Sequence, residues 1–449
     1  MENISIDSKN YLKTFIRYVL LNMVSVIGVS VYFLADTYFI ANGVNSNGVV
    51  ALNLALPMYS IIYGVAQTFA IGSGALYSVS QEEEYKKKII VNCIVWGILL
   101  ELLFTIVIQV FLDPLSILLG AKSSEVLRYT KDYLGIISKG AVFFLSSAVL
   151  CSLTRNFGNP KVVMVASFIG SMSNVLFDWL YIYVFKMGMF GAGLATITSP
   201  ILTSILILPT FIKSIKHLNV TRQDILKCIS FRTSLNIVKV GFSAFINELS
   251  SGVTILVFNM VLLQYLGEIG VAGYGIIANI ALVYVAFFNG VATGVQPLIS
   301  SLYGKGDYST LKKCLRLALI FEVVIGVLFV VYSFAFTNPT ISIFNKDRDQ
   351  TLQQIAYNGL RLYFCGYVMT GIDICLVSYF ASVIEPLKST ILSSMRGFAV
   401  IIPMILILPH ILGVNGIWLS VPFTDALTLI VGVTMLIFSL KKYKKSSKV

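Results

Sequence analysis

The sequence contains little charge for its length. Asp, Glu, Lys and Arg together make up 12% of its 449 residues, whereas a soluble globular protein has about 25%. Hydrophobic residues make up 57%, and the mean hydropathy is +0.85. This composition excludes an ordinary soluble protein and indicates an integral membrane protein. Dividing the length into apolar spans of ~20 residues with short connectors predicts about twelve transmembrane helices.

Residues that carry much of enzyme chemistry are also scarce. The chain has only two His, His217 and His410, and its six Cys show no CxxC spacing. We therefore expect the Cys side chains to be small buried hydrophobes rather than metal ligands. HExxH, GxSxG and P-loop motifs are all absent from the sequence. These absences argue against a membrane-embedded enzyme and against an ATP-driven pump.

The start of the chain has no pattern of a cleavable signal peptide. Its first apolar run, at residues 18–41, is long enough to span a bilayer, so we expect nothing to be removed. The net charge of +12 is carried mainly by connectors between spans, which argues against a nucleic-acid partner. Lys and Arg concentrate on the side of the termini. This bias predicts a multi-pass protein of the plasma or inner membrane with both termini in the cytoplasm.

The two halves of the chain resemble each other. GVVALNLALPMYSIIYGVAQTFAIGSG, from Gly48, aligns without a gap with GVAGYGIIANIALVYVAFFNGVATGVQ, from Gly270. FLDPLSILLG, from Phe111, aligns in the same way with FTNPTISIFN, from Phe336. Because corresponding helices face the same way in each half, this is a parallel repeat about an axis along the membrane normal.

The repeat predicts the architecture. We expect an all-α integral membrane fold of about twelve transmembrane helices, in two pseudo-symmetric six-helix bundles around a central cleft. The predicted parts are an N-terminal lobe (1–213), a cytoplasmic linker (214–238) and a C-terminal lobe with a basic cytoplasmic tail (239–449). A cleft that opens alternately to each side indicates a transporter.

The stretch from Ala166 to Ser199 contains polar residues inside apolar helices. Asn174 and Asp178 lie four residues apart, so on a helix they share one face. Thr196 follows a Gly-rich turn, after which the chain can fold back towards that pair. A carboxylate inside a bilayer is costly unless it meets a cation, a proton or water, so this cluster is a functional candidate. The alternative is an Asp at a helix end, bonded to backbone or reaching the headgroups.

Five segments form a series along nearly the whole chain. They are LADTYFIANGV (34–44), RNFGNPK (155–161), SNVLFDWLYIYVFKMGMFGAGLATITS (173–199), QPLISSLYGKGDYSTLKKCLRLAL (296–319) and YFASVIEPLKSTILSSMRGFAVIIP (379–403). In this order they resemble the multidrug and toxic compound extrusion (MATE) transporters, in the wider group that includes lipid-linked oligosaccharide flippases. The resemblance implies a secondary antiporter that exports cationic amphiphiles, such as drugs and dyes, in exchange for Na⁺ or H⁺.

The resemblance also implies a cation-coupling site in the N-terminal lobe. Its roles fall on Asp36, Asn174, Asp178 and Thr196. Two carboxylates, a carboxamide and a hydroxyl are oxygen ligands of the kind that Na⁺ prefers, so these four residues are also the candidate metal site. The same carboxylates can instead bind a proton, as a coupled pair. The residues leave Na⁺ and H⁺ open, and we expect no other cofactor.

A second candidate cation site lies in the C-terminal lobe. In another branch of the family, acids of spans seven and ten are responsible for cation binding, and Glu248 and Asp373 occupy comparable places. Asp425 and Arg396 lie in neighbouring predicted spans. The alternative for Asp373 and Asp425 is a structural ion pair with Arg396.

Candidate substrate-contacting residues combine aromatic rings, a thioether and polar groups, which suit amphipathic cations of varied shape. They are Tyr32, Asn53, Met58, Tyr63, Gln67, Tyr274, Asn279, Tyr284 and Phe288. For each of them, helix packing or lipid contact is the alternative role.

The main alternative function is a flippase for lipid-linked or anionic amphiphiles. Such a protein requires basic residues inside the cleft, and the sequence offers Arg396 and Lys139. The expected partners of the chain are the lipid bilayer and small cationic amphiphiles, and we expect it to be a monomer.

Overall fold

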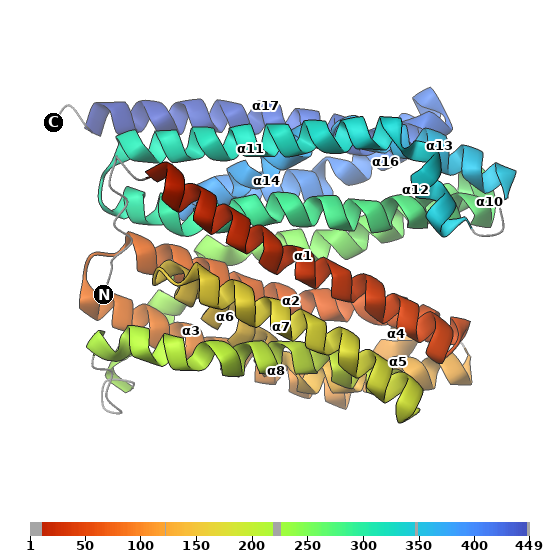
Figure 1. The fold of residues 1–449 in the computed structure, drawn as a ribbon, viewed down its shortest axis with the longest axis horizontal. Coiled ribbons are helices and arrows are strands. Elements are labelled where there is room, and N and C mark those ends of the chain that lie inside the picture. The colour runs from red at the N-terminus through yellow and green to blue at the C-terminus, as the bar shows by residue number, and fades with distance from the viewer. Residues whose placement is uncertain (1–10, 122, 219–225, 346–348, 447–449) are drawn as a thin grey trace.

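Helices form every regular element in the described structure (Figure 1). The computed structural model describes residues 11–121, 123–218, 226–345 and 349–446. The N-terminal lobe consists of α1 (Tyr11–Gly43), α2 (Ser46–Val79), α3 (Glu83–Val110), α4 (Leu112–Leu118), α5 (Ser124–Lys139), α6 (Ala141–Asn156), α7 (Pro160–Asp178) with the π-helical η1 (Trp179–Val184), and α8 (Gly188–Ile215), followed by the short η2 (Lys216–Leu218).

The C-terminal lobe repeats this order of elements. It consists of α10 (Phe231–Gly304), α11 (Tyr308–Ala335), α12 (Thr337–Phe344), α13 (Gln350–Phe364), α14 (Tyr367–Ser382), α15 (Pro386–Ser394) with the π-helical η3 (Met395–Ala399), α16 (Ile401–Leu412) and α17 (Val414–Ser446). The short helices α4 and α12 hold the same place in the two lobes, and so do the helices that begin at Pro160 and Pro386.

The number of membrane crossings follows from helix length and hydropathy. Eight helices are long and apolar enough to cross a membrane, and two bent pairs, α5 with α6 and α13 with α14, raise the total to 10. One of the eight, α10, is 74 residues long and breaks at Gly267, so it provides two crossings. α1, with 33 residues, is also longer than a bilayer requires. The predicted all-α membrane fold of twelve transmembrane helices in two bundles is confirmed.

Glycine permits the matching bends in the two lobes. Both bent pairs turn by 47°. At the first bend, a Cβ on Gly140 would lie 3.0 Å from Cβ of Ile197, and at the second, a Cβ on Gly366 would lie 2.8 Å from Cα of Pro422. A side chain at either position would force α8 or α17 away from the bend.

α1 packs against both lobes. Its first half places Phe15 and Tyr18 in a buried cluster with residues of α10, α11 and α14, whereas Ile40 near its end lies in the core of the N-terminal lobe. Asn22 fixes the crossing, because its side-chain amide donates to the carbonyl of Gly290, at 2.9 Å. Figure 1 shows α1 running diagonally across the boundary between the lobes.

The lobes meet closely near the end of the molecule where α1 begins and α17 ends, which we call the terminus end. A Cβ on Gly72 of α2 would lie 2.9 Å from the carbonyl carbon of Ile237 in α10. A Cβ on Gly241 would lie 2.7 Å from the carbonyl carbon of Thr68, and one on Gly304 would lie 2.8 Å from Cα of Val79. We call this backbone contact between α2 and α10 the glycine seal.

The predicted linker lies at the same end. α8 continues to Ile215 and α10 begins at Phe231, so helix occupies both edges of the interval 214–238. Residues 219–225 of the linker and 447–449 of the basic tail lie outside the described residues, as do residues 1–10. The domain boundaries therefore stay a prediction.

Candidate cation site and central cavity

The four residues of the N-terminal candidate site are all buried. Asp36 is 3% exposed, Asn174 and Asp178 are 0% exposed, and Thr196 is 2% exposed. α1 supplies Asp36, α7 supplies Asn174 and Asp178 on successive turns, and α8 supplies Thr196. The carboxylates of Asp36 and Asp178 lie close enough to interact electrostatically. The structure thus brings the two acids together from different helices.

Tyr133 of α5 completes this cluster, and the sequence analysis did not include it. Its hydroxyl lies within electrostatic range of Asp36 and close to Thr196, and its side chain is 3% exposed. The hydroxyl of Thr196 also donates to the carbonyl of Ala192, at 3.0 Å. Tyr133 of α5 therefore lies between residues of α1 and α8 at the site.

The polar atoms of the site are not satisfied by the protein. Both oxygens of Asp178, both polar side-chain atoms of Asn174 and one oxygen of Asp36 have no hydrogen-bond partner among the described residues. Buried polar groups in folded proteins are normally paired, so these atoms require a ligand, a proton or water. The described residues contain no group of three His, Cys, Asp or Glu that could hold a metal. A Na⁺ ion here would therefore need the oxygens of Asn174 and Thr196 as well.

A change of helix type lies directly beside each charged cluster. In the N-terminal lobe, η1 begins at Trp179, immediately after Asp178. In the C-terminal lobe, η3 contains Arg396 itself. π-Helical turns cost stability and are frequent at functional sites, because they redirect side chains out of the regular α-helical register.

In the C-terminal lobe, three of the four candidate residues form one cluster. Nε of Arg396 donates to a carboxylate oxygen of Asp425 at 3.1 Å, and the hydroxyl of Thr370 donates to the other oxygen. Asp373 lies within electrostatic range of both Arg396 and Asp425, and its oxygens have no hydrogen-bond partner in the described structure. This geometry agrees with the structural ion pair that the sequence left open for Asp425.

Glu248 is separate from that cluster. Its neighbours are Tyr32 and Tyr63 of the N-terminal lobe, and a Cβ on Gly64 of α2 would lie 3.4 Å from Cβ of Glu248. The carboxylate of Glu248 faces the large cavity between the lobes. Its position suits contact with a molecule in that cavity.

The central cavity has a volume of about 570 Å³ and is lined by both lobes. Four of the predicted substrate-contacting residues line it: Tyr32, Tyr63, Gln67 and Tyr274. The rings of Tyr59 and Tyr63 stack with centroids 5.8 Å apart, which stiffens this wall. Tyr32 lies one helical turn before Asp36, so the buried acids are adjacent to the cavity.

The other five predicted substrate-contacting residues lie off the cavity wall. Asn53 of α2 and Asn279 of α10 are exposed, and Met58 packs against the core of the N-terminal lobe. Phe288 is fully buried, and Tyr284 stacks on Phe329 with ring centroids 3.9 Å apart. Met58, Tyr284 and Phe288 therefore have the alternative role, which is helix packing.

The basic residues of the cavity differ from those that the sequence offered. Arg396 lines the cavity, but Lys139 is exposed on α5 and does not. Arg155, in the last turn of α6, lines it instead. It is the first residue of the RNFGNPK segment, one of the five that carry the resemblance.

A family model described as MatE matches residues 22–180 and 243–406, one segment in each lobe. The chain belongs to the MatE family. This family consists of membrane transporters, so the chain is a multi-pass membrane transporter and not an enzyme.

Similar proteins and structures agree with this membership. The multidrug export protein MepA of Staphylococcus aureus (strain MSSA476) is 27% identical to this MatE protein over 405 residues, which are 88% of this chain and 87% of the relative. MepA of Staphylococcus saprophyticus is 25% identical over 397 residues, 86% of this chain and 85% of the relative.

Solved structures show the same fold at lower identity. An outward-facing multidrug resistance MATE family transporter superimposes with a TM-score of 0.89 at 22% identity, covering 96% of each chain. A MATE protein in complex with MaL6 gives a TM-score of 0.87 at 23% identity, covering 96% of this chain and 97% of the other.

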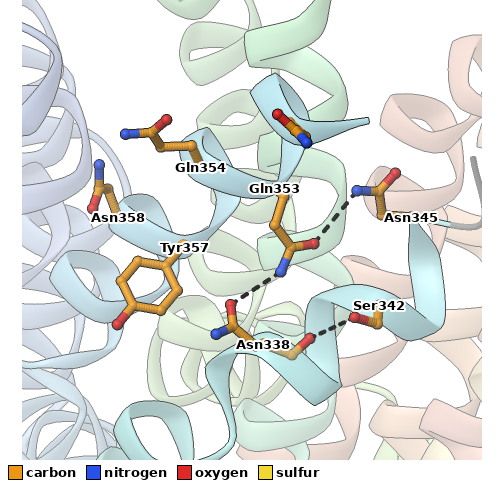
Figure 2. A pocket seen from close by; sticks show the side chains of 8 residues that line it. Asn338, Ser342, Asn345, Gln353, Gln354, Tyr357 and Asn358 are labelled. Carbon is orange, nitrogen blue, oxygen red and sulfur yellow. Dashed lines mark hydrogen bonds between the residues drawn. The ribbon is translucent and has the colours of Figure 1, made fainter. Parts of the chain in front are cut away.

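This MatE protein has a second hollow, of about 440 Å³, where α12 meets α13. Six carboxamide side chains line it, together with Ser342 and Tyr357. The amide of Gln353 donates to Oδ1 of Asn338 at 3.1 Å, and the amide of Asn345 donates to Oε1 of Gln353 at 3.4 Å (Figure 2). These mutual hydrogen bonds hold α12 against α13, and the hollow is separate from the central cavity.

Proposed function

We propose that this protein is a multidrug efflux antiporter that exports cationic amphiphiles in exchange for Na⁺ or H⁺. The name of the MepA relatives, multidrug export protein, supports the substrate class. The single observation that carries the proposal is the placement of a buried, unsatisfied acid cluster one helical turn from an aromatic cavity.

The cavity suits a cationic amphiphile. Tyr32, Tyr63 and Tyr274 offer aromatic faces for cation–π contact and apolar burial. Glu248 adds a carboxylate that the described protein does not pair. The aromatic faces and the carboxylate of Glu248 can bind a positive group without demanding one molecular shape, which is the requirement for exporting varied compounds.

The acid cluster suits a coupling cation. A cation that binds among Asp36, Asp178, Asn174 and Thr196 supplies the partner that their oxygens lack. Either Na⁺ or a proton does so, Na⁺ through several oxygens and H⁺ through one carboxylate. Because Asp36 and Tyr32 lie one turn apart on α1, a cation bound at Asp36 acts on the same helical segment that presents Tyr32 to the cavity.

Export requires the cavity to face each side of the membrane in turn. The glycine seal closes the lobes together at the terminus end, and the cavity-lining residues of α10 begin at Ala244, directly after Gly241. Under the proposal the seal is one of two alternating closures. The excess of Lys and Arg in the loops at the terminus end supports placing that end in the cytoplasm. Under the proposal, the two lobes of one chain form the whole transport pathway, so the protein works as a monomer.

Efflux of ethidium from whole cells tests the proposal. We expect wild-type efflux to follow either the Na⁺ or the pH gradient, and Asp36→Asn and Asp178→Asn each to abolish the gradient dependence. Glu268→Gln, which neutralises an exposed acid on α10, is the matched control and should leave efflux unchanged. Full gradient-driven efflux in both Asn variants would move the coupling site to Glu248 and Asp373. A wild type with no gradient-driven efflux of any cation would refute the antiporter.

A further inference from the structure

Two opposite charges face the central cavity without a partner. Arg155 projects from α6 of the N-terminal lobe, and Glu248 from α10. Neither makes an ion pair or a side-chain hydrogen bond within the described part of the chain. The other basic residue of the cavity, Arg396, is already paired with Asp425 at 3.1 Å. The cavity therefore presents one free cation and one free carboxylate among its described lining residues.

The two charges lie near the same aromatic side chain. Tyr63 of α2 lies within electrostatic range of both Arg155 and Glu248. Its ring stacks on Tyr59 and meets Phe144 edge-on, with centroids 6.4 Å apart. A flat apolar skeleton that lies against Tyr63 thus has both a positive and a negative group of the protein near it.

The surroundings of Arg155 are suited to an anion. Ser147 and Ser167 line the cavity close to Cys151, which lies within electrostatic range of Arg155. Hydroxyl groups can donate to a carboxylate, and the guanidinium presents two parallel N–H groups that match carboxylate geometry. No Asp or Glu is among the electrostatic neighbours of Arg155 in the described structure. The positive charge of this wall is therefore available to a bound molecule.

We propose that Arg155 forms an anion-binding subsite, so that the cavity selects amphiphiles that carry a carboxylate in addition to a cationic group. This inference rests on the proposed export function for its physiological meaning. Arg155 holds the carboxylate, Glu248 holds the cationic group, and Tyr63 supports the apolar skeleton between them. A bilayer-embedded charge is costly when unpaired, and a ligand with both charges pairs Arg155 and Glu248 at once.

Three xanthene dyes test this subsite, because they share a skeleton and differ in charge. Tetramethylrhodamine carries a cationic xanthene and a free carboxylate, its methyl ester carries only the cation, and fluorescein carries only negative charge. Binding is measured by fluorescence anisotropy with the full-length protein in lipid nanodiscs. We expect wild type to prefer tetramethylrhodamine to its ester by about tenfold or more, the range of a charge-assisted hydrogen bond.

The variants separate a subsite from a structural role. Arg155→Gln should remove the preference for the carboxylate and leave affinity for the ester unchanged, and Arg155→Lys should restore part of the preference. Arg316→Gln, which removes an exposed positive charge from the first turns of α11, is the matched control and should bind all three dyes as wild type does. Glu248→Gln should weaken both rhodamines.

Several results would overturn the inference. They are equal loss of both rhodamines in Arg155→Gln, a wild type that prefers the ester, and a wild type that binds neither rhodamine. Fluorescein binding as tight as that of tetramethylrhodamine would also overturn it, since the cavity would then select anions alone. A protein that shows the predicted preference but drives no gradient-dependent dye transport would refute the antiporter and leave the subsite standing.

Discussion

The glycine seal makes a quantitative prediction about which side the cavity faces. Replacing Gly241 with Ala places a methyl group 2.7 Å from the carbonyl carbon of Thr68 and 3.0 Å from the backbone nitrogen of Gly72. Carbon atoms in contact lie about 3.5–4.0 Å apart, so α2 and α10 must separate by about 1 Å. The obstructing atoms belong to backbone, so no side chain can move aside.

The energetic effect falls on one conformation. Overpacking of this kind costs about 1–3 kcal/mol, and the cost disappears when the lobes part at the terminus end. The population closed at this end should therefore fall, relative to the open one, by about 5- to 150-fold. Gly252→Ala in the same helix is the control, because the nearest atom to its new methyl group would be Oγ of Ser60 at 3.9 Å.

The rate at which a native cysteine is labelled can measure how often the terminus end opens. Cys151 lines the central cavity, whereas Cys365 is exposed and is replaced by Ser to remove background labelling. A membrane-impermeant maleimide applied from the terminus end of oriented proteoliposomes should label Cys151 much faster in Gly241→Ala than in wild type or Gly252→Ala. Labelling from the opposite side should slow down. Identical rates for Gly241→Ala and wild type from both sides would refute the idea that this contact is a closure.

Two further predictions concern stability in nanodiscs. Arg396→Gln leaves Asp425, which is 1% exposed, without its ion-pair partner, so this variant should destabilise the protein by about 3–5 kcal/mol. The double variant with Asp425→Asn should recover much of this loss. If Arg396→Gln alone were as stable as wild type in thermal unfolding, the stabilising role of the ion pair would be contradicted. Ile384 has a φ of 56°, where its counterpart in the other lobe, Gly158, has a φ of 89°. Because a β-branched residue is strained in this left-handed region, Ile384→Gly should stabilise the protein by about 1 kcal/mol. If the variant instead unfolded at a lower temperature than wild type, the packing of the Ile384 side chain would outweigh the backbone strain.

The sequence allowed the fold to be predicted because its signals are local and repeated. Runs of apolar residues mark the spans, and the repeated FLDPLSILLG and FTNPTISIFN segments correspond to the α4 and α12 regions. Asp178 was identifiable because a carboxylate within an apolar run is rare enough to stand out, whereas Asp36 followed from the resemblance to the MATE transporters. The proximity of the two acids is visible only in the structure, since it depends on how α1 packs against α7.

Other parts of the site had no such signal. Tyr133 lies on the amphipathic helix α5, where a tyrosine beside Asp132 resembles an ordinary interfacial residue. Arg155 stands at the junction of a span and a connector, and whether a long side chain turns into a cavity or out to water depends on its rotamer. Asn53 and Asn279 are polar residues within predicted spans, but neither lines the cavity. Which residues of a span reach the cavity is set by packing between helices that are distant in sequence.

The two lobes treat positive charge differently. In the C-terminal lobe, the acids Asp373 and Asp425 have Arg396 as a counter-ion that is built into the chain and cannot leave. In the N-terminal lobe, Asp36 and Asp178 have no basic side chain among their interacting groups in the described structure, so under the proposed function their counter-ion comes from solution. The proposal then makes the N-terminal lobe responsive to the ionic medium, whereas the charge balance of the C-terminal lobe is fixed by its own residues. A change in ion concentration would act on one lobe and leave the other unaltered, which is what relative motion of the two lobes requires.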